Sequence, residues 1–292
     1  MKLTSVALAV TLLSPPMVVA QPAQPAALIR DIASVSFTLV VKAAGTLVGW
    51  GPDADGQAAR PGSAGGAVTA PVTLDLPGRA LQVAIGETTA CALLEDGTVW
   101  AWGTRDDGAL GNGTRTNGWL PGDVSGLDRV VAIATGMGSA GGNSFSGAVR
   151  DDGTVWLWGT ATSGVMGDGN EPAAPDLPGG RILLPRQLKS LTNVKALSLG
   201  YGHAAALLRD GALWMRGFTG YGQIGVPSRD SSYHPKPVKV TGISNVAATY
   251  VGSMRSFAVR TDGSLWIWGF ASIGGQGILG KNLRVPTLLE LP

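Results

Sequence analysis

Few residues in this chain have the types and spacing that enzymatic chemistry needs. The chain has two histidines, His203 and His234, and one cysteine, Cys91. Nucleophilic hydrolysis requires a Ser or Cys activated by a histidine base, and the sequence has no such order and no Gly-x-Ser-x-Gly elbow. Its glycine-rich segments lack the Gly-Lys-Ser/Thr of a phosphate-binding loop. We therefore predict a protein that is not an enzyme and that uses no cofactor.

Metal binding and thiol chemistry are also poorly supported. The segment 53–56, Asp-Ala-Asp-Gly, resembles the start of a calcium loop but lacks the later acidic ligands, so we expect no metal. Cys91 lies in the apolar run 90–94 and is interpreted as a small buried hydrophobic residue. His203 is interpreted as a packed residue that bonds neighbouring backbone. A single cysteine also excludes an intramolecular disulfide.

One sequence motif, Asp-Gly-x-x-Trp-x-Trp-Gly, recurs along the chain. It occurs at 96–103, 152–159, 210–217 and 262–269, with a shortened copy at 45–51, and Arg216 replaces the second tryptophan of one copy. Successive copies lie 52 to 58 residues apart. A period in this range is typical of solenoids, propellers and repeat arrays.

The second repeat shows what each unit contains. Residues 83–85 and 91–95 are apolar strands, and Asp96-Gly97 predicts a two-residue type I′ hairpin before the return strand 98–102. Trp100 and Trp102 share one face of that strand, and its other face is also apolar, which suits a sheet stacked between two neighbours. A Gly-x-x-Gly segment, a variable loop and a proline-containing strand complete the unit. Units of about four strands without a helix pattern predict an all-β β-propeller. A flat sandwich and an open solenoid are the alternatives.

The repeats divide the chain into five units, 28–78, 79–127, 128–191, 192–243 and 244–292. We treat 28–292 as a single propeller domain and expect a closed ring of five blades. An incomplete arc and a ring completed by a partner chain stay open at this point, as does a seven-bladed ring.

The N-terminus predicts export. Lys2 precedes an apolar stretch at 3–13 that is too short to span a bilayer, and small residues end at Ala20. We interpret 1–20 as a signal peptide and 21–27 as a short Pro/Ala linker, so that the protein is secreted or periplasmic, with no membrane insertion after cleavage. The net charge of +2, without a basic run, gives no reason to expect nucleic acid.

The unit resembles the repeat of the regulator of chromosome condensation family. The family pattern is Gly-x-x-His-x-x-Ala-Leu, then Asp-Gly-x-Val-x-x-Trp-Gly, then Gly-Gln-Leu-Gly and a later proline. Here Gly200, His203, Ala206 and Leu207 fit the first part fully, whereas the other copies replace the histidine. The resemblance covers about residues 28–292 and implies a β-propeller. Its members act as guanine nucleotide exchange factors, ubiquitin-ligase modules and secreted bacterial inhibitors of β-lactamase, and this chain looks like a secreted bacterial-type member.

Binding of another protein is the function that we favour. Trp, Tyr and Arg dominate protein interfaces, and the loops between the repeated landmarks hold such residues at different positions in every copy. We expect a monomer that binds an unidentified extracytoplasmic protein, as an inhibitor or as an interaction scaffold. The alternatives are exchange activity on a small GTPase and a carbohydrate-binding or enzymatic propeller that uses the central channel. The candidate binding residues are Arg105, Asp106, Arg115, Trp119, Phe218, Tyr221, Arg229, Tyr233 and Phe270.

Overall fold

The structure, a computed structural model, describes residues 29–53, 56–59, 66–103, 108–116, 118–137, 144–160, 181–227, 233–270 and 282–290. Twenty strands in these ranges form five antiparallel sheets of four strands each. The expected all-β fold of five four-stranded blades is therefore confirmed. The expected signal peptide lies outside the described residues.

The sheets are numbered here as blades 1 to 5 in chain order. Blade 1 contains β1 (Ile29–Ser34), β2 (Thr38–Lys42), β3 (Leu47–Pro52) and β4 (Ala67–Leu74). Blade 2 contains β5 (Ala80–Ile85), β6 (Thr89–Leu94), β7 (Val99–Gly103) and β8 (Gly118–Asp123). Blade 3 contains β9 (Val130–Met137), β10 (Ser144–Arg150), β11 (Val155–Thr160) and β12 (Arg181–Leu188). Blade 4 contains β13 (Val194–Leu199), β14 (His203–Leu208), β15 (Leu213–Phe218) and β16 (Tyr233–Lys239). Blade 5 contains β17 (Val246–Val251), β18 (Arg255–Arg260), β19 (Leu265–Gly269) and β20 (Leu283–Leu288).

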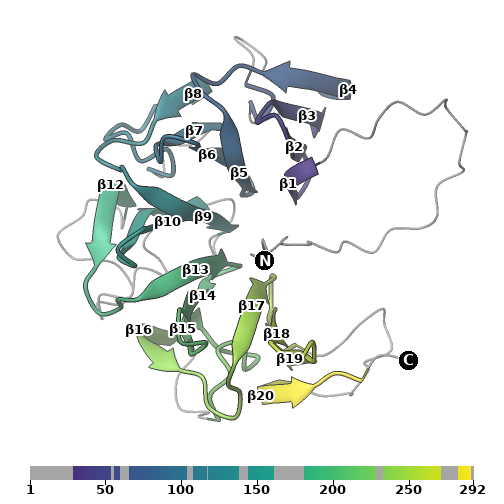
Figure 1. The fold of residues 1–292 in the computed structure, drawn as a ribbon, viewed down its shortest axis with the longest axis vertical. Coiled ribbons are helices and arrows are strands. Elements are labelled where there is room, and N and C mark those ends of the chain that lie inside the picture. The colour runs from purple at the N-terminus through teal and green to yellow at the C-terminus, as the bar shows by residue number, and fades with distance from the viewer. Residues whose placement is uncertain are drawn as a thin grey trace, which may run out of the picture.

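The blades stand side by side along an arc, with the first strand of each blade on the inner side (Figure 1). Strand order within each sheet follows the chain, and the first strands of consecutive blades contact each other from β1 through β17. Each sheet falls within one of the five repeat units. This arrangement places the turns that follow strands two and three along the two rims of the arc.

The hairpin between the second and third strands differs from the expected type I′ turn. Gly97 has φ +82°, but Asp96 is not among the described non-glycine residues with positive φ. The Gly97 N–H donates to the Leu94 carbonyl at 3.0 Å and the Leu94 N–H to the Thr98 carbonyl at 2.9 Å, as in a three-residue loop that ends on a glycine bulge. The Asp96 carboxylate also accepts the Thr98 N–H at 2.9 Å, which adds a local bond across the turn.

The core lies between the blades, because each sheet packs on the next one through apolar side chains. Every residue of β6 is buried, as expected for a strand covered on both faces. The second tryptophan of the repeat joins neighbouring blades. The Trp102 indole N–H donates to the Gln57 carbonyl at 2.9 Å, and that of Trp158 donates to the Ala109 carbonyl at 2.8 Å. The two acceptors belong to the segments that start at Gly56 and Gly108 in the preceding blades, so the indole of the repeat bonds the neighbouring blade at these two junctions.

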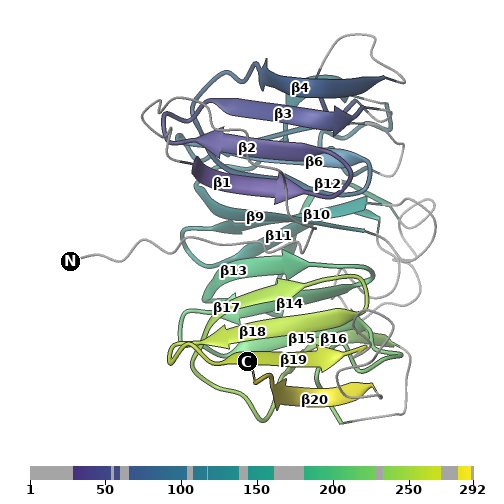
Figure 2. The ribbon, with the colours of Figure 1, turned by 90° about the vertical axis from the view of Figure 1, so that its right-hand side faces the viewer.

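The arc is open between blades 1 and 5. Figure 2 looks into this opening, with β1–β4 above and β17–β20 below. Among the described residues no inter-blade packing like that of the four consecutive blade pairs joins blade 5 to blade 1. The expected closed ring of five blades is thus not what the structure shows. The side chains packed between two sheets set each blade-to-blade step, and four such steps do not bring blade 5 back to blade 1.

Candidate protein-binding site

Four of the candidate binding residues form one aromatic cluster on a rim of blades 4 and 5. The Phe218 ring lies 6.1 Å from Tyr221 and 5.5 Å from Tyr233, and Tyr221 lies 5.4 Å from Phe270, all between ring centroids. Three of these side chains are half-buried, and Tyr233 is 40% exposed. We call this set the aromatic cluster. Tilted and edge-on rings at such distances stabilise one another and keep a firm surface.

The local backbone fixes the cluster. Phe218 ends β15, and its N–H donates to the Gly202 carbonyl at 2.7 Å. The chain then turns at Gly220, where an added Cβ would lie 2.6 Å from the Phe218 ring, so that only glycine lets this ring lie against the turn. Phe270 follows β19 in the same way, with its N–H donating to the Met254 carbonyl at 2.8 Å. The repeat therefore places equivalent residues of two blades on one rim.

Tyr221 and Tyr233 come from the variable loop of blade 4. The Tyr221 N–H donates to the side-chain oxygen of Gln223 at 2.9 Å, which holds the turn in place. Tyr233 begins β16 and pairs with Phe218 on β15, so their rings lie side by side. The pairing is a tertiary effect, because 15 positions of sequence separate the two residues.

Two neighbours of the cluster were not expected from the sequence. Arg284 on β20 packs against the turn that follows Tyr221, since a Cβ on Gly222 would lie 2.8 Å from the Arg284 Cα. Met254 is exposed beside Phe270, whose N–H it accepts. The repeat itself was the signal for Arg284. In the described copies, Gly56, Gly108 and Gly222 each face the fourth strand of the next blade.

The remaining candidate residues do not join the cluster. Trp119 is half-buried and its ring packs on Gly56 of blade 1, where a Cβ would lie 2.5 Å away, so it serves inter-blade packing. Arg115 is exposed in the loop before β8 in blade 2. Arg105, Asp106 and Arg229 lie outside the described residues.

His203 and Cys91 are buried between blades. The Nδ1 atom of His203 lies 3.2 Å from the Tyr201 carbonyl oxygen, and its Nε2 atom lies 3.3 Å from the Ser256 hydroxyl of blade 5. Burial lowers the pKa of His203 to about 4, partly offset by hydrogen bonds to the Tyr201 and Arg255 backbone. Burial raises the pKa of Cys91 to about 12, so that its thiol stays protonated and unreactive at neutral pH. Both residues thus have the packing role that the sequence indicates.

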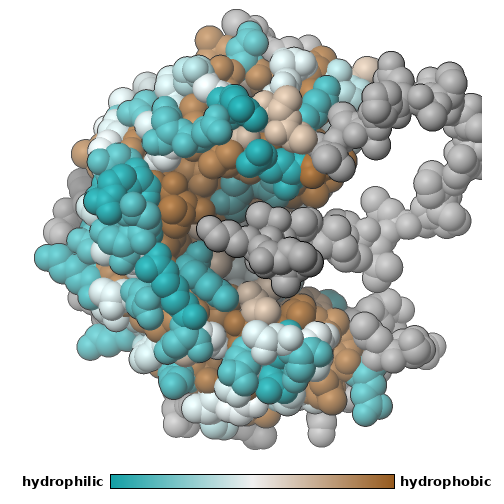
Figure 3. Space-filling model, in the orientation of Figure 1, coloured by the Kyte–Doolittle hydropathy of each residue, from teal (hydrophilic) through white to brown (hydrophobic). Residues whose placement is uncertain are grey.

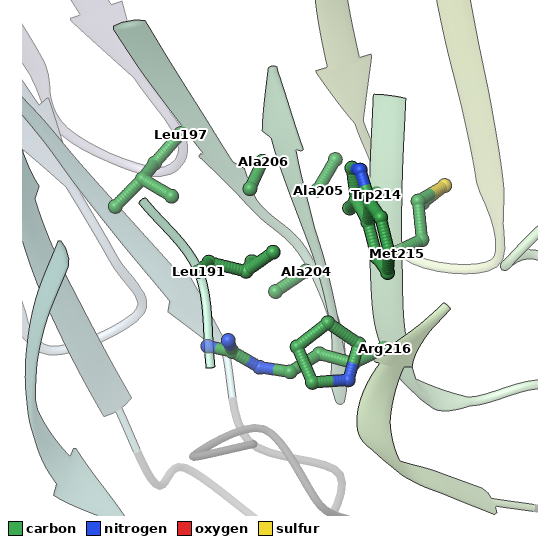
Figure 4. Close-up of a pocket in the computed structure, with 9 residues that line it drawn as sticks. Leu191, Leu197, Ala204, Ala205, Ala206, Trp214, Met215 and Arg216 are labelled. Carbon is green, nitrogen blue, oxygen red and sulfur yellow. The ribbon is translucent and has the colours of Figure 1, made fainter. Parts of the chain in front are cut away.

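Arg216, which replaces a repeat tryptophan, borders a small cavity in blade 4. Its buried side chain extends from β15 toward Leu191, below Ala204 (Figure 4). The cavity measures about 10 Å³, which is room for roughly one water molecule. It is therefore a packing gap and not a ligand pocket.

The chemistry available to the described residues is that of a binding surface. Within those ranges no group of three or more His, Cys, Asp or Glu side chains could hold a metal ion. The same ranges contain no helix that is long and apolar enough to cross a membrane. The aromatic cluster can bury apolar or aromatic side chains of another protein, with the Tyr221 and Tyr233 hydroxyls as polar contacts. Fold and site together define a β-propeller scaffold.

Comparison with known proteins identifies the repeat. Residues 96–146 and 152–207 match the regulator of chromosome condensation (RCC1) repeat, and residues 81–108 match a second description of it. The chain belongs to the regulator of chromosome condensation repeat family. The expectation drawn from the sequence motifs is confirmed at this level.

The relatives include proteins of several organisms. The chain is 28% identical to the ultraviolet-B receptor UVR8 of Arabidopsis thaliana, over 70% of this chain and 44% of that protein. It is 30% identical to the mitochondrial RCC1 domain-containing protein RUG3 of the same plant, over 71% and 46%. The chain thus spans somewhat less than half the length of these relatives. The solved structure of Prp20p from Saccharomyces cerevisiae has a TM-score of 0.70 at 22% identity, covering 88% of this chain and 61% of Prp20p.

Proposed function

We propose that this protein is an exported, non-enzymatic scaffold that binds an extracytoplasmic protein through the aromatic cluster on blades 4 and 5. The observation that carries the proposal is the contact between Phe218, Tyr221, Tyr233 and Phe270. Aromatic residues grouped in this way, with one of them well exposed, are the usual anchors of protein interfaces. Inhibition of the bound protein is one form that such binding takes.

Family relatives support protein binding as the general role. Yeast Prp20 has been solved with Kap60 bound, and Prp20p is described as binding Gsp1p and histones. Those partners belong to Prp20p. At 22% identity, the similarity to Prp20p supports a shared fold and not a shared activity. We therefore do not favour the alternative of nucleotide exchange on a small GTPase. Export rests on the N-terminal sequence pattern.

Substitution within the cluster tests the binding surface. Tyr233→Ser removes an exposed ring without opening the core, whereas Leu120→Ser removes a similarly exposed apolar side chain on β8 of blade 2. Proteins of the extracytoplasmic fraction are captured on the wild-type protein and on each variant. We expect one captured protein to be lost with Tyr233→Ser and kept with Leu120→Ser. Equal capture by all three proteins would contradict the assignment of the surface.

Export and the lack of catalysis need their own measurements. N-terminal sequencing of protein recovered outside the cytoplasm should give a chain that starts at Gln21. A full-length chain retained in the cytoplasm refutes export. Turnover of a glycan or peptide substrate by the purified protein refutes the non-enzymatic role, even if binding is observed.

A further inference from the structure

The four internal junctions between blades share one backbone hydrogen bond. The first residue of each inner strand donates its N–H to the carbonyl of the glycine in the Asp-Gly turn, or its equivalent, of the preceding blade. The bonds run from Ala80 to Gly45 at 2.9 Å, Val130 to Gly97 at 3.0 Å, Val194 to Gly153 at 3.1 Å and Val246 to Gly211 at 3.2 Å. Each junction therefore consists of an inner-strand start from one blade and a glycine turn from the blade before it.

The start of blade 1 presents the first half of this junction without a neighbouring blade among the described residues. By strand register Ile29 holds the position of these first residues, because each of them pairs with the end of the second strand of its blade. Ile29 is 61% exposed, whereas its four counterparts are at most 5% exposed. An apolar residue that every other blade buries is thus left in solvent at this end of the arc.

The glycine turn of blade 5 presents the second half. A Cβ added to Gly97, Gly153 or Gly211 would lie 2.9 to 3.2 Å from backbone of the next blade, but a Cβ on Gly263 would meet nothing within 4 Å. The loop before β18 shows the same difference. A Cβ on Gly200 would lie 2.3 Å from the Gly252 carbonyl of blade 5, while a Cβ on Gly252 would meet only its own blade.

The outer face of blade 5 is apolar and partly exposed. Ala205, Leu207 and Leu213 of blade 4 are buried against blade 5. Their counterparts Phe257, Val259 and Leu265 in blade 5 are only half-buried. Figure 3 shows hydrophobic residues on both sides of the opening of the arc.

We propose that blade 1 of one copy of this protein docks on blade 5 of a second copy, by the same junction that the chain uses four times internally. The second copy is the occupant that the observations favour, because one chain carries both halves of the junction. Docking would give the Ile29 N–H the Gly263 carbonyl as acceptor and would bury Ile29 together with Phe257 and Val259. This self-association is independent of binding at the aromatic cluster, and it departs from the monomer expected from the sequence.

Such a contact is head-to-tail, so it generates a ring where the rotation closes and an open chain of copies where it does not. The opening in Figure 1 is narrower than the arc itself. A second copy therefore cannot continue the same circle in its plane. Because packing between the sheets sets the blade-to-blade step, an assembly that uses the same junction rises out of this plane.

Two variants block one half each. Ile29→Asp places a charge on the blade 1 half. Gly263→Asn introduces a residue type that tolerates positive φ, and the added side chain has free space in the isolated copy. In a junction, however, its Cβ would meet the backbone of the docked blade, as at the equivalent glycines. The matched controls are Leu184→Asp, at a residue 51% exposed on β12, and Gly126→Asn, at a turn glycine with φ +77° and equally open space. Circular dichroism checks that all four variants are folded.

Sedimentation velocity over about 1 to 100 µM protein measures assembly. We expect the wild type and both controls to associate with increasing concentration. Ile29→Asp loses the burial of one isoleucine in the junction, so this variant should need an at least about tenfold higher protein concentration than the wild type to associate. Gly263→Asn should also raise the concentration needed. A mixture of the two blocked variants retains one intact junction and should stop at two copies. The proposal is overturned by a wild type that stays monomeric, by blocked variants that assemble like the wild type, or by a mixture that stays monomeric.

Discussion

The indole hydrogen bonds between blades lead to a quantitative prediction, because the chain contains its own control. Trp158 and Trp268 are both fully buried at the same repeat position. The Trp158 N–H donates to the Ala109 carbonyl at 2.8 Å, whereas the Trp268 N–H has no hydrogen-bond partner within the described parts of the chain. Replacement by phenylalanine removes a similar volume at both sites. Trp158→Phe also removes the donor of a buried carbonyl, which costs about 1–3 kcal/mol, and Trp268→Phe removes a buried N–H that was unsatisfied.

Urea unfolding followed by far-ultraviolet circular dichroism measures the difference. Trp158→Phe should lower the free energy of unfolding by about 1–3 kcal/mol more than Trp268→Phe, at an unchanged dependence on urea concentration. Trp102→Phe should behave like Trp158→Phe, because its N–H donates to the Gln57 carbonyl. Equal losses for Trp158→Phe and Trp268→Phe would refute the role given to the inter-blade bond.

Further predictions follow from the buried titratable groups and the turn glycines. The pKa of His203 is about 4 in the folded protein and 6.5 in the unfolded chain. The contribution of neutral His203 to the free energy of unfolding is therefore complete above pH 6.5 and is lost as the pH falls to about 4. This loss is about 3 kcal/mol, and urea unfolding at pH 7.5 and 5 should show a weaker acid dependence for His203→Gln than for the wild type. Cys91 should react with a thiol reagent only after unfolding, and rapid labelling of the native protein would contradict its burial. Gly220→Ala should displace the Phe218 ring, and unchanged ring resonances in aromatic NMR spectra would count against the tight turn. Gly97→Val should destabilise by at least about 1 kcal/mol in thermal unfolding, because positive φ strains the residue and its Cβ meets the Arg129 backbone.

The repeated Asp-Gly-x-x-Trp-x-Trp-Gly motif made the four-stranded blades predictable. Trp100 and Trp102 share one face and Val99 and Ala101 the other, and this alternation is a local property of a strand covered on both sides. The hairpin position was predictable from Asp96-Gly97, but its type was not, because the same dipeptide also fits a three-residue loop that ends on a glycine bulge. The candidate residues Phe218 and Phe270 were found through their equivalent repeat positions.

The sequence by itself determined five apolar four-stranded units, a packing role for His203 and Cys91, and a set of variable aromatic residues. It could do so because strand alternation, turn chemistry and repeat register depend on neighbours along the chain. Only the tertiary structure decided that Tyr221 and Tyr233 meet Phe218 and Phe270, and that Arg284 lies beside them. It also decided that the arc stays open, with Ile29 at one end and Gly263 at the other. Both outcomes depend on the rotation between stacked sheets, which is set by side chains from different repeats and accumulates over the whole arc.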